Sequence, residues 1–239
     1  MMLATLGLSV ATALVASGPL AGTTVVLDPG HQLGNANFPA EISRPVPAGG
    51  FTKPCNSTGT ATDGGYPEAT LNWQVSRQLR ARLVDLGASV VMTRTSNRAD
   101  RWGPCVDVRG RVGNRIDADL KVSIHGDGSY AAGARGFHVI APAARAGWTG
   151  DIARPSMALA RSVRRGLARS GVPVANYIAG GDGLDVRSDL GTLNLSDVPT
   201  VMVELGNMRH PDDARRMTSA RGRAAYASAL LTGIRRFLR

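Results

Sequence analysis

The chain has 239 residues, of which 43% are hydrophobic and 19% are charged. This balance fits one folded domain and excludes a disordered chain, a collagen, a coiled coil and a protein with many membrane spans. The net charge is +10 and only 5% of residues are aromatic, so an anionic partner is favoured but binding of nucleic acid by base stacking is not.

The first 22 residues have the pattern of a leader. No charged residue precedes Asp28, and an apolar run over residues 3–16 is followed by small residues and Pro19. This pattern favours a secretory signal peptide at residues 1–22, although the positively charged residues that usually begin a signal peptide are missing. An uncleaved membrane anchor is the alternative, for which the run is short. We therefore expect a domain at residues 23–239 in a protein that is secreted, periplasmic or associated with the cell wall.

The two cysteines, Cys55 and Cys105, agree with export. An even number of cysteines behind a leader favours one disulfide. A disulfide between them would close a loop of about 50 residues and would contribute about 4 kcal/mol to the free energy of unfolding. Two free buried thiols are the alternative, while a catalytic cysteine is disfavoured because the spacing is not that of a redox CxxC motif.

The first elements in chain order are a strand, a long loop and a helix. Residues 23–28 are β-branched and apolar, and Pro29 and Gly30 end the strand just before His31. Residues 32–65 are rich in Gly, Pro, Asn, Ser and Thr, which predicts a long functional or stapled loop. Leucine and valine then recur at helical spacing from Pro67 to Gly87, which predicts a helix.

The rest of the chain continues this alternation. We expect strands over residues 88–93, 120–124, 136–141 and 199–205, and helices over residues 106–116, 155–168 and 212–238. Residues 184–195 fit irregular structure or a short strand. The pattern predicts an α/β fold, a single-domain sandwich with a central mixed, mainly parallel sheet flanked by helices.

Three polar residues lie where ligands bind in such sheets, at the carboxyl ends of strands. They are His31, His125 and Glu204, while Glu68 falls in the first turn of a helix. Two imidazoles and one carboxylate would form a zinc site with an open fourth position, and another carboxylate would serve as the base. A carboxylate such as Glu204 is costly in an apolar strand unless it has a partner. His138 fits a structural residue.

Other chemistries lack their motifs. The sequence has no GxSxG nucleophile elbow, no Walker motif and no GxGxxG after a strand. It also has no HEXXH or two-Cys, two-His zinc pattern. His210 opens the last helical region, which fits a solvated residue near a helix cap.

Four segments together resemble the motifs of zinc-dependent N-acetylmuramoyl-L-alanine amidases of the amidase-3 type. They are residues 25–31, 66–72, 122–127 and 199–207, and they occur in the family's order. The similarity runs from about Thr23 to the C-terminus. It is greatest to small single-domain mycobacterial and actinobacterial members, which have a cysteine pair matching Cys55 and Cys105.

The resemblance implies a role for each candidate residue. His31, Glu68 and His125 would hold Zn²⁺, Glu204 would act as general base and then as acid, and Asp28 would orient His31. The family cleaves the amide bond between the lactyl group of N-acetylmuramic acid and the L-alanine of the peptidoglycan stem peptide. The sequence departs from the family pattern in two places: Gly126 stands where alanine is usual and Asn207 where an aromatic residue is common.

We therefore expect a monomeric secreted zinc amidase whose substrate is peptidoglycan or a muropeptide, with no nucleic-acid partner and no stable membrane anchor. A non-catalytic or partner-activated peptidoglycan-binding protein on the same fold is the main alternative. A zinc peptidase that cleaves within the stem peptide and a polyanion-binding module are others. The positive charge, which is arginine apart from Lys53 and Lys121, fits a solvated basic surface or affinity for a wall polymer.

Overall fold

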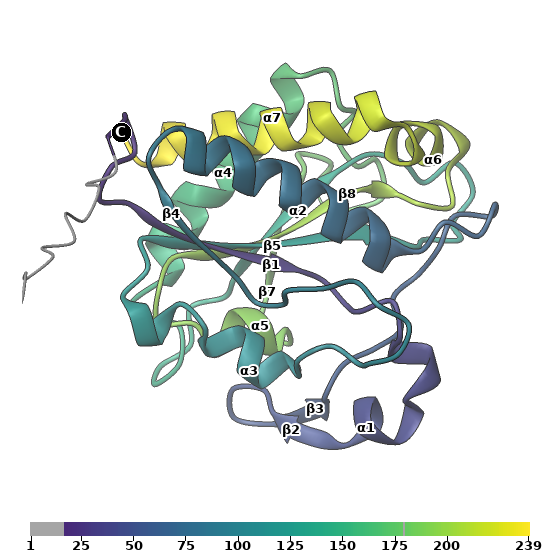
Figure 1. Ribbon diagram of the computed structural model, residues 1–239, viewed down its shortest axis with the longest axis horizontal. Helices are drawn as coiled ribbons and strands as arrows, with labels where there is room; N and C mark the ends of the chain where they lie inside the picture. Colours follow the sequence, from purple (N-terminus) through teal and green to yellow (C-terminus); the bar gives the residue numbers. More distant parts are fainter. Residues whose placement is uncertain (1–16, 179) are drawn as a thin grey trace, which may run out of the picture.

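The computed structural model describes residues 17–178 and 180–239. Its central feature is a six-stranded sheet with the order β4-β1-β5-β8-β6-β7 (Figure 1). The strands are β1 (Thr24–Pro29), β4 (Ser89–Met92), β5 (Leu120–Asp127), β6 (His138–Pro142), β7 (Leu184–Arg187) and β8 (Thr200–Asn207). Only the pairing of β6 with β8 is antiparallel. The predicted mixed, mainly parallel sheet is confirmed.

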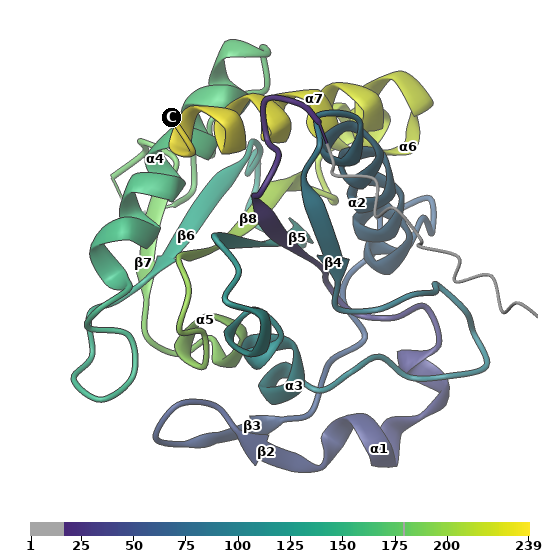
Figure 2. The same ribbon diagram turned by 60° about the vertical axis from the view of Figure 1, so that its left-hand side comes forward.

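Helices cover both faces of this sheet. On one face lie α2 (Glu68–Asp85), α4 (Ala153–Arg169) and α7 (Ala220–Phe237), with α6 (Pro211–Thr218) leading into α7. On the other face lie α3 (Val106–Arg111), the short turn η2 (Asn114–Ile116) and α5 (Gly191–Asn194) (Figure 2). The predicted sandwich is therefore present, and the second face is the thinner of the two.

The helix predicted after Pro67 shows why the sequence folds in this way. Leu71, Val75, Leu79 and Leu83 of α2 are all fully buried in the main hydrophobic cluster, which also contains the inner residues of β1, β5 and β8. Their four-residue spacing places them on one face of the helix. Burial of each such side chain contributes roughly 1.5–3 kcal/mol, so this stripe fixes α2 on the sheet.

The long loop predicted over residues 32–65 is not uniform. It contains η1 (Asn35–Asn37), α1 (Pro39–Ser43) and a small antiparallel hairpin of β2 (Pro45–Pro47) and β3 (Thr52–Pro54). Periodicity missed these elements because each is only three to five residues long. The segment 184–195 likewise divides into β7 and α5.

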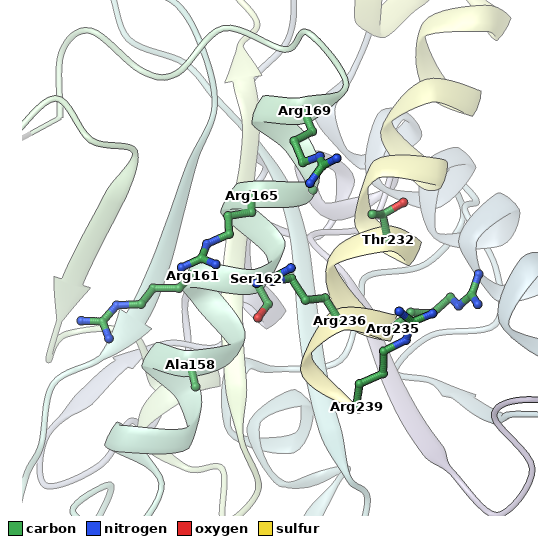
Figure 3. A pocket seen from close by; sticks show the side chains of 10 residues that line it. Ala158, Arg161, Ser162, Arg165, Arg169, Thr232, Arg235, Arg236 and Arg239 are labelled. Atoms are coloured by element: carbon green, nitrogen blue, oxygen red, sulfur yellow. The ribbon is translucent and has the colours of Figure 1, made fainter.

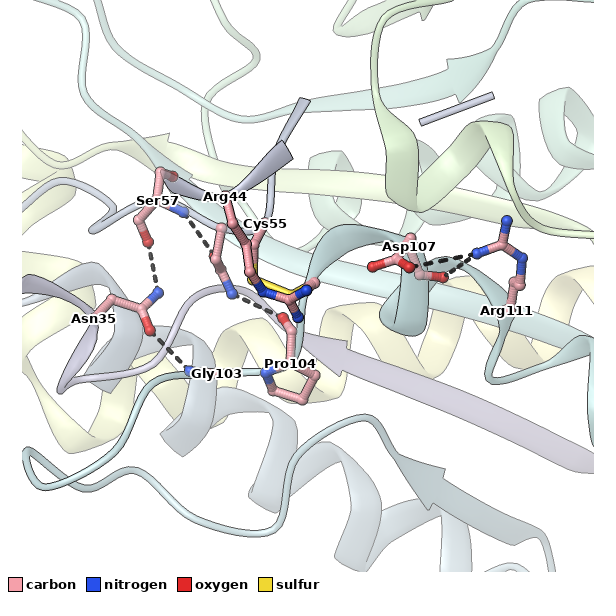
Figure 4. Close-up of a disulfide and its surroundings, with 10 residues drawn as sticks. Asn35, Arg44, Cys55, Ser57, Gly103, Pro104, Asp107 and Arg111 are labelled. Atoms are coloured by element: carbon pink, nitrogen blue, oxygen red, sulfur yellow. Dashed lines mark hydrogen bonds and ion pairs between the residues drawn. A yellow bond between two sulfur atoms is a disulfide. The ribbon is translucent and has the colours of Figure 1, made fainter. Parts of the chain in front are cut away.

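The predicted disulfide joins this segment to the start of α3. Cys55 and Cys105 are bonded with their Cα atoms 4.2 Å apart, and the guanidinium of Arg44 donates to the Cys105 sulfur (Figure 4). The backbone N–H of Val106 donates to the Cys55 carbonyl at 2.7 Å. The expected disulfide is thus present, and together with the backbone hydrogen bond it fixes Cys55 to the start of α3.

Lys121 is buried beneath α3 and α5. Its ammonium group donates to the carbonyls of Gly110 and Thr192, which ties both short helices to β5. Burial lowers the pKa of Lys121 to about 7. This anchor holds α3 at a fixed position against the sheet.

The predicted leader at residues 1–22 lies outside the described residues except for positions 17–22. In that short stretch the Leu20 side chain is buried in the main cluster, and its N–H donates to the Leu86 carbonyl at 2.9 Å. These residues therefore pack on the domain. Among residues 17–178 and 180–239, no helix is both long enough and apolar enough to cross a membrane.

Candidate metal centre

Three of the predicted site residues meet at one end of the sheet. His31 follows β1, His125 lies near the end of β5, and Glu68 is the first residue of α2. One donor atom from each, two imidazole nitrogens and a carboxylate oxygen, lie within 4.8 Å of one another. Because β1 and β5 are parallel neighbours, their carboxyl ends bring the two histidines together. The imidazole rings stand edge to face, with their centroids 4.9 Å apart.

The turn before His31 depends on a close approach of backbone to side chain. A Cβ atom on Gly30 would lie 2.2 Å from Cε1 of His125, so only glycine fits. The φ angle of His31 is 58°, an uncommon value for a residue with a side chain. Its Nδ1 lies 3.0 Å from the Ser57 carbonyl oxygen. A carbonyl only accepts, so Nδ1 carries a proton and Nε2 is the nitrogen that faces Glu68.

Glu68 occupies the centre of the group. Its Oε1 lies 3.2 Å from Nε2 of His31 and 2.9 Å from Nδ1 of His125. Asn72, one helical turn later, donates to the same oxygen, and the backbone N–H of Thr60 donates to Oε2 at 2.9 Å. Burial acts to raise the pKa of Glu68, but the two histidines hold it well below its usual range. The side chain is therefore an anion at neutral pH.

The arrangement fits a divalent cation. Burial lowers the pKa of His125, which favours the neutral imidazole that a metal requires. Two imidazoles and one carboxylate are a donor set of catalytic zinc sites, in which a fourth position stays open. Zn²⁺ thus suits the residues present, and its positive charge would compensate the buried anion.

Glu204 lies beside this group but is not one of its members. It is paired in register with His125 on the adjacent strand β8. Its Oε2 is buried and has no hydrogen-bond partner among the residues that the structure describes. Burial raises its pKa well above the usual range, and the charges of Glu68 and Asp127 act in the same direction. A carboxyl group with this pKa, next to a candidate metal site, suits proton transfer.

Asp28 forms no hydrogen bond with the His31 ring that we expected it to orient. Its carboxylate instead accepts two hydrogen bonds from the Arg109 guanidinium, at 2.7 and 2.9 Å, and one from each of the Thr93 and Ser123 hydroxyls. Burial acts to raise the pKa of Asp28, but Arg109 keeps it below its usual range. Arg109 in turn lies 3.4 Å from Nε2 of His125. The contact of Asp28 with the site therefore runs through Arg109 to His125.

Sequence reasoning missed several residues that shape the site. Arg94, just after β4, donates to the carbonyls of Pro29, Gly30 and Ala69. It thereby joins the turn before His31 to the first turn of α2. Neither Arg94 nor Arg109 stands out in the sequence, because arginine makes up nearly all of the positive charge. Asn72 belongs to the segment 66–72 that carries the resemblance and lies four residues after Glu68 in the same helix, but its contact with Glu68 was not predicted.

The two backbone groups that contact the site, the Ser57 carbonyl and the Thr60 N–H, belong to the loop that follows Cys55. Asn35 donates to the Ser57 carbonyl, and its side-chain oxygen accepts from the Gly103 N–H (Figure 4). Asn56 donates to the Pro104 carbonyl and accepts from the Ser57 N–H. The staple and these bonds hold the loop that supplies Ser57 and Thr60 to the metal-site residues. No sequence pattern marks a functional backbone atom.

A cavity of about 370 Å³ opens beside the two histidines on the α3 and α5 side. Its cationic lining residues are Arg109 and, from the hairpin, Lys53. Lys53 also donates to the Asp189 carbonyl at 2.7 Å, so it bridges the hairpin to the loop after β7. The cavity gives the site room for a substrate of more than a few atoms.

The other two histidines differ in their relation to the site. His138, predicted as structural, is buried on β6 and directly opposes Glu204 in the antiparallel register. The Tyr177 ring lies edge-on against it. His210, predicted near a helix cap, is the residue that caps α6 and accepts from the Asp212 N–H.

The two departures from the resembled pattern have local explanations. A Cβ on Gly126 would lie 3.0 Å from the Leu71 side chain and 3.2 Å from that of Met208, so even alanine there requires these side chains to shift slightly. The Asn207 amide donates to the carbonyls of Ser129 and Ala134. Asn207 thus holds the loop after β5 in place, and neither position removes a candidate ligand.

Comparisons with known proteins find matches that cover nearly all of residues 25–236. The Amidase_3 family model, described as N-acetylmuramoyl-L-alanine amidase, matches residues 25–236. The chain is 46% identical over 222 residues to the N-acetylmuramoyl-L-alanine amidase Rv3717 of Mycobacterium tuberculosis, covering 92% of this chain and 88% of that protein. Among solved structures, it is similar to the N-acetylmuramyl-L-alanine amidase Ami1 of Mycobacterium smegmatis, with a TM-score of 0.84, 43% identity and coverage of 93% and 99%. Ami1 of Mycobacterium abscessus gives a TM-score of 0.85 at 42% identity, with coverage of 92% and 100%.

Proposed function

This chain belongs to the N-acetylmuramoyl-L-alanine amidase family Amidase_3, and from that membership we propose that it is a zinc-dependent, exported enzyme. It hydrolyses the amide bond between the lactyl group of N-acetylmuramic acid and the L-alanine of the stem peptide in peptidoglycan or released muropeptides. The observation that carries the proposal is the convergence of His31, Glu68 and His125 on one point with Glu204 beside it. A binding protein has no need for a buried carboxyl of raised pKa next to such a donor set.

The proposed ligands are Nε2 of His31, Nδ1 of His125 and Oε1 of Glu68. A Zn²⁺ ion held there would supply Lewis-acid chemistry, polarising the scissile carbonyl and lowering the pKa of water. The chain's own task is to keep the three donors aligned. The Ser57 carbonyl fixes His31, and Thr60 and Asn72 fix Glu68, so little rearrangement of the ligands is required.

Glu204 moves the proton. As a carboxylate it takes a proton from the attacking water, and as a carboxylic acid it delivers that proton to the nitrogen of the leaving L-alanine. Both steps are efficient when the pKa of the group lies near the working pH. Burial and the neighbouring carboxylates raise the pKa of Glu204 in that direction, which supports this role over that of a metal ligand.

Asp28 and Arg109 act as positioning residues for His125. The Arg109 guanidinium donates two hydrogen bonds to the Asp28 carboxylate, from Nε and Nη2, and its Nη2 lies 3.4 Å from Nε2 of the His125 ring. A planar guanidinium held by two parallel hydrogen bonds is rigid, so it limits rotation of the imidazole. The role that we expected for Asp28, to orient a ligand, is thus proposed here for the other histidine.

Export is part of the proposal because peptidoglycan lies outside the cytoplasmic membrane. The apolar run at residues 3–16 followed by small residues supports a signal peptide. Leu20 packs in the domain core, so we place the cleavage before Gly18 rather than after Gly22. The disulfide supports an oxidising compartment.

Product analysis tests the function directly. The mature protein is incubated with a defined MurNAc-peptide, with and without a chelator, in parallel with Glu204→Gln. Mass spectrometry is expected to show free MurNAc and a peptide that begins with L-alanine, and both controls are expected to abolish them. A shortened stem peptide would instead identify a peptidase. Stoichiometric zinc without cleavage would support a partner-activated or non-catalytic protein.

A further inference from the structure

A cleft of about 790 Å³ lies between α4 and α7, on the outer surface of the thicker helical layer (Figure 3). None of its lining residues belongs to the candidate metal centre. Its walls are mainly arginine, three from each side: Arg161, Arg165 and Arg169 from α4, and Arg235, Arg236 and Arg239 from α7 and the residues after it. All of these side chains are exposed except that of Arg235, which is half-buried.

Helical spacing produces the two arginine walls. Arg161, Arg165 and Arg169 recur every four residues, which places them along one side of α4. Thr232, Arg236 and Arg239 recur every three or four residues along the facing side of α7. Figure 3 shows Arg169 and Arg236 projecting into the space between the two helices, while Arg161 and Arg165 extend along the outer side of α4. Residues of both rows line the same cleft.

The floor of the cleft consists of small residues at a close helix crossing. A Cβ on Gly166 would lie 2.4 Å from the Ala229 carbonyl oxygen, and a Cβ on Gly233 would lie 2.5 Å from the Val163 Cα. The helices touch at their backbones there. The remaining floor positions are Ala158, Ser162 and Thr232. Short side chains below long ones make the groove deep rather than flat.

The positive charge in this cleft is not neutralised by the protein. Within the part of the chain that the structure describes, no carboxylate forms an ion pair with any of the six arginines. The remaining positions, 1–16 and 179, contain no Asp or Glu. Like charges at helical neighbours are destabilising, and six in one groove repel each other. A bound anion would remove that repulsion.

The residue types that line the cleft favour one class of anionic partner over the others. Single-stranded nucleic acid is usually held by aromatic stacking as well as charge, and no aromatic residue lines the cleft. A membrane surface is favoured by apolar side chains that insert beside the charges, and none of the exposed large hydrophobic residues lies in α4 or α7. A flexible chain of phosphates needs neither feature, and guanidinium groups pair with phosphate oxygens in a bidentate manner.

We propose that the cleft between α4 and α7 binds a linear polymer with repeated phosphate groups, such as a phosphodiester-linked wall polymer. This inference goes beyond the amidase function, because it assigns a second site that makes no contact with the reacting bond. The site would hold the enzyme on an anionic matrix while the metal centre, at the end of the sheet, stays free for substrate.

The test uses short-chain inorganic polyphosphate as the probe and calorimetry on the mature protein. The cleft variant carries Arg165→Gln, Arg169→Gln and Arg236→Gln. The control variant carries Arg77→Gln, Arg80→Gln and Arg115→Gln, which removes the same charge from exposed positions elsewhere. Affinity of the cleft variant is expected to fall by about tenfold or more, and the slope of log K against log salt by about two, while the control stays near the parent protein.

Three outcomes would overturn the proposal. Equal losses in both variants would show that only net charge matters. Tighter binding of a single-stranded oligonucleotide than of polyphosphate of equal charge would identify a nucleic-acid site. Stronger binding to anionic vesicles, lost in the cleft variant, would identify a membrane surface. Cleavage of a small soluble muropeptide is expected to be unchanged in both variants, so that result separates the cleft from the amidase function.

Discussion

The Ser57 carbonyl oxygen lies 3.0 Å from Nδ1 of His31, although the two residues are 26 positions apart in the chain. This contact joins a loop stapled by a disulfide to a candidate zinc ligand. It also sets which nitrogen of His31 faces Glu68, because the carbonyl requires a proton on Nδ1. The loop between Cys55 and Glu68 is thus part of the site, because its backbone contacts the candidate ligands directly.

Removal of the disulfide is therefore expected to weaken both stability and metal binding. In the variant Cys55→Ser with Cys105→Ser, the free energy of unfolding is expected to fall by about 4 kcal/mol, because the unfolded chain regains the freedom of a closed loop of some 50 residues. Zinc affinity, measured by competition with a chromophoric chelator, is expected to fall as Ser57 and Thr60 lose their fixed positions. Unchanged zinc affinity would mean that the loop holds its path without the staple.

A zinc-content assay is expected to distinguish variants of the proposed metal ligands from a variant of the proposed base. His31→Ala, Glu68→Gln and His125→Ala are each expected to lose stoichiometric zinc and activity together. Glu204→Gln is expected to retain one zinc per chain, measured by elemental analysis, while kcat falls by about 10²–10⁴-fold through loss of proton transfer. Loss of zinc in Glu204→Gln would move that residue from base to ligand.

The buried pair of Asp28 and Arg109 is expected to be essential to stability. Asp28→Asn leaves the Arg109 charge buried without its partner, which costs about 3–5 kcal/mol. Because the folded state lowers the pKa of Asp28, the carboxylate stabilises the fold above the pKa of the unfolded chain, and this contribution is lost as pH falls toward the folded value. Urea unfolding of the metal-free protein measures both effects.

A double-mutant cycle provides the control for this pair. Asp28→Asn combined with Arg109→Gln is expected to cost clearly less than the sum of the two single changes, because no unpaired charge remains. Additive costs would show that the two residues act independently. The same variants report on positioning, since zinc affinity should fall in each single variant in which the guanidinium is lost or loosened.

The pH profile is expected to report on Glu204. A base must be deprotonated, and burial together with the Asp127 carboxylate raises the pKa of Glu204, so the acid limb of kcat/KM should lie above that of an exposed glutamate. Asp127→Asn removes this charge and is expected to move the limb to lower pH. Asp117→Asn, an exposed change at a left-handed backbone position that asparagine tolerates, should leave it in place. A limb that stays fixed or rises in Asp127→Asn would contradict the assignment.

The start of the mature protein is expected to lie before Gly18. Intact-mass analysis of the exported protein locates it, since every cleavage position gives a different mass. A start at Thr23 would remove Leu20 from the core and would contradict our placement. Retention of the whole apolar run in a membrane fraction would support the uncleaved anchor instead.

Much of this protein was readable from local sequence. The period of leucine and valine predicted α2, and apolar runs ended by turn residues predicted the strands, because both patterns arise from side-chain directions within one element. The rule that parallel strands meet at their carboxyl ends singled out His31, His125 and Glu204. The family resemblance added the proposed role of Glu68, which by itself reads as an ordinary acid in a helix's first turn.

Other features were decided only by the tertiary structure. The Ser57 and Thr60 contacts are made by backbone atoms, which every residue has, so no residue type marks them. Arg94 and Arg109 look like any other arginine until burial sets them against the site. The antiparallel β6, which places His138 opposite Glu204, and the arginine cleft between α4 and α7 arise from packing between distant elements. Such contacts depend on how elements meet in space, whereas the sequence determines chiefly the elements themselves.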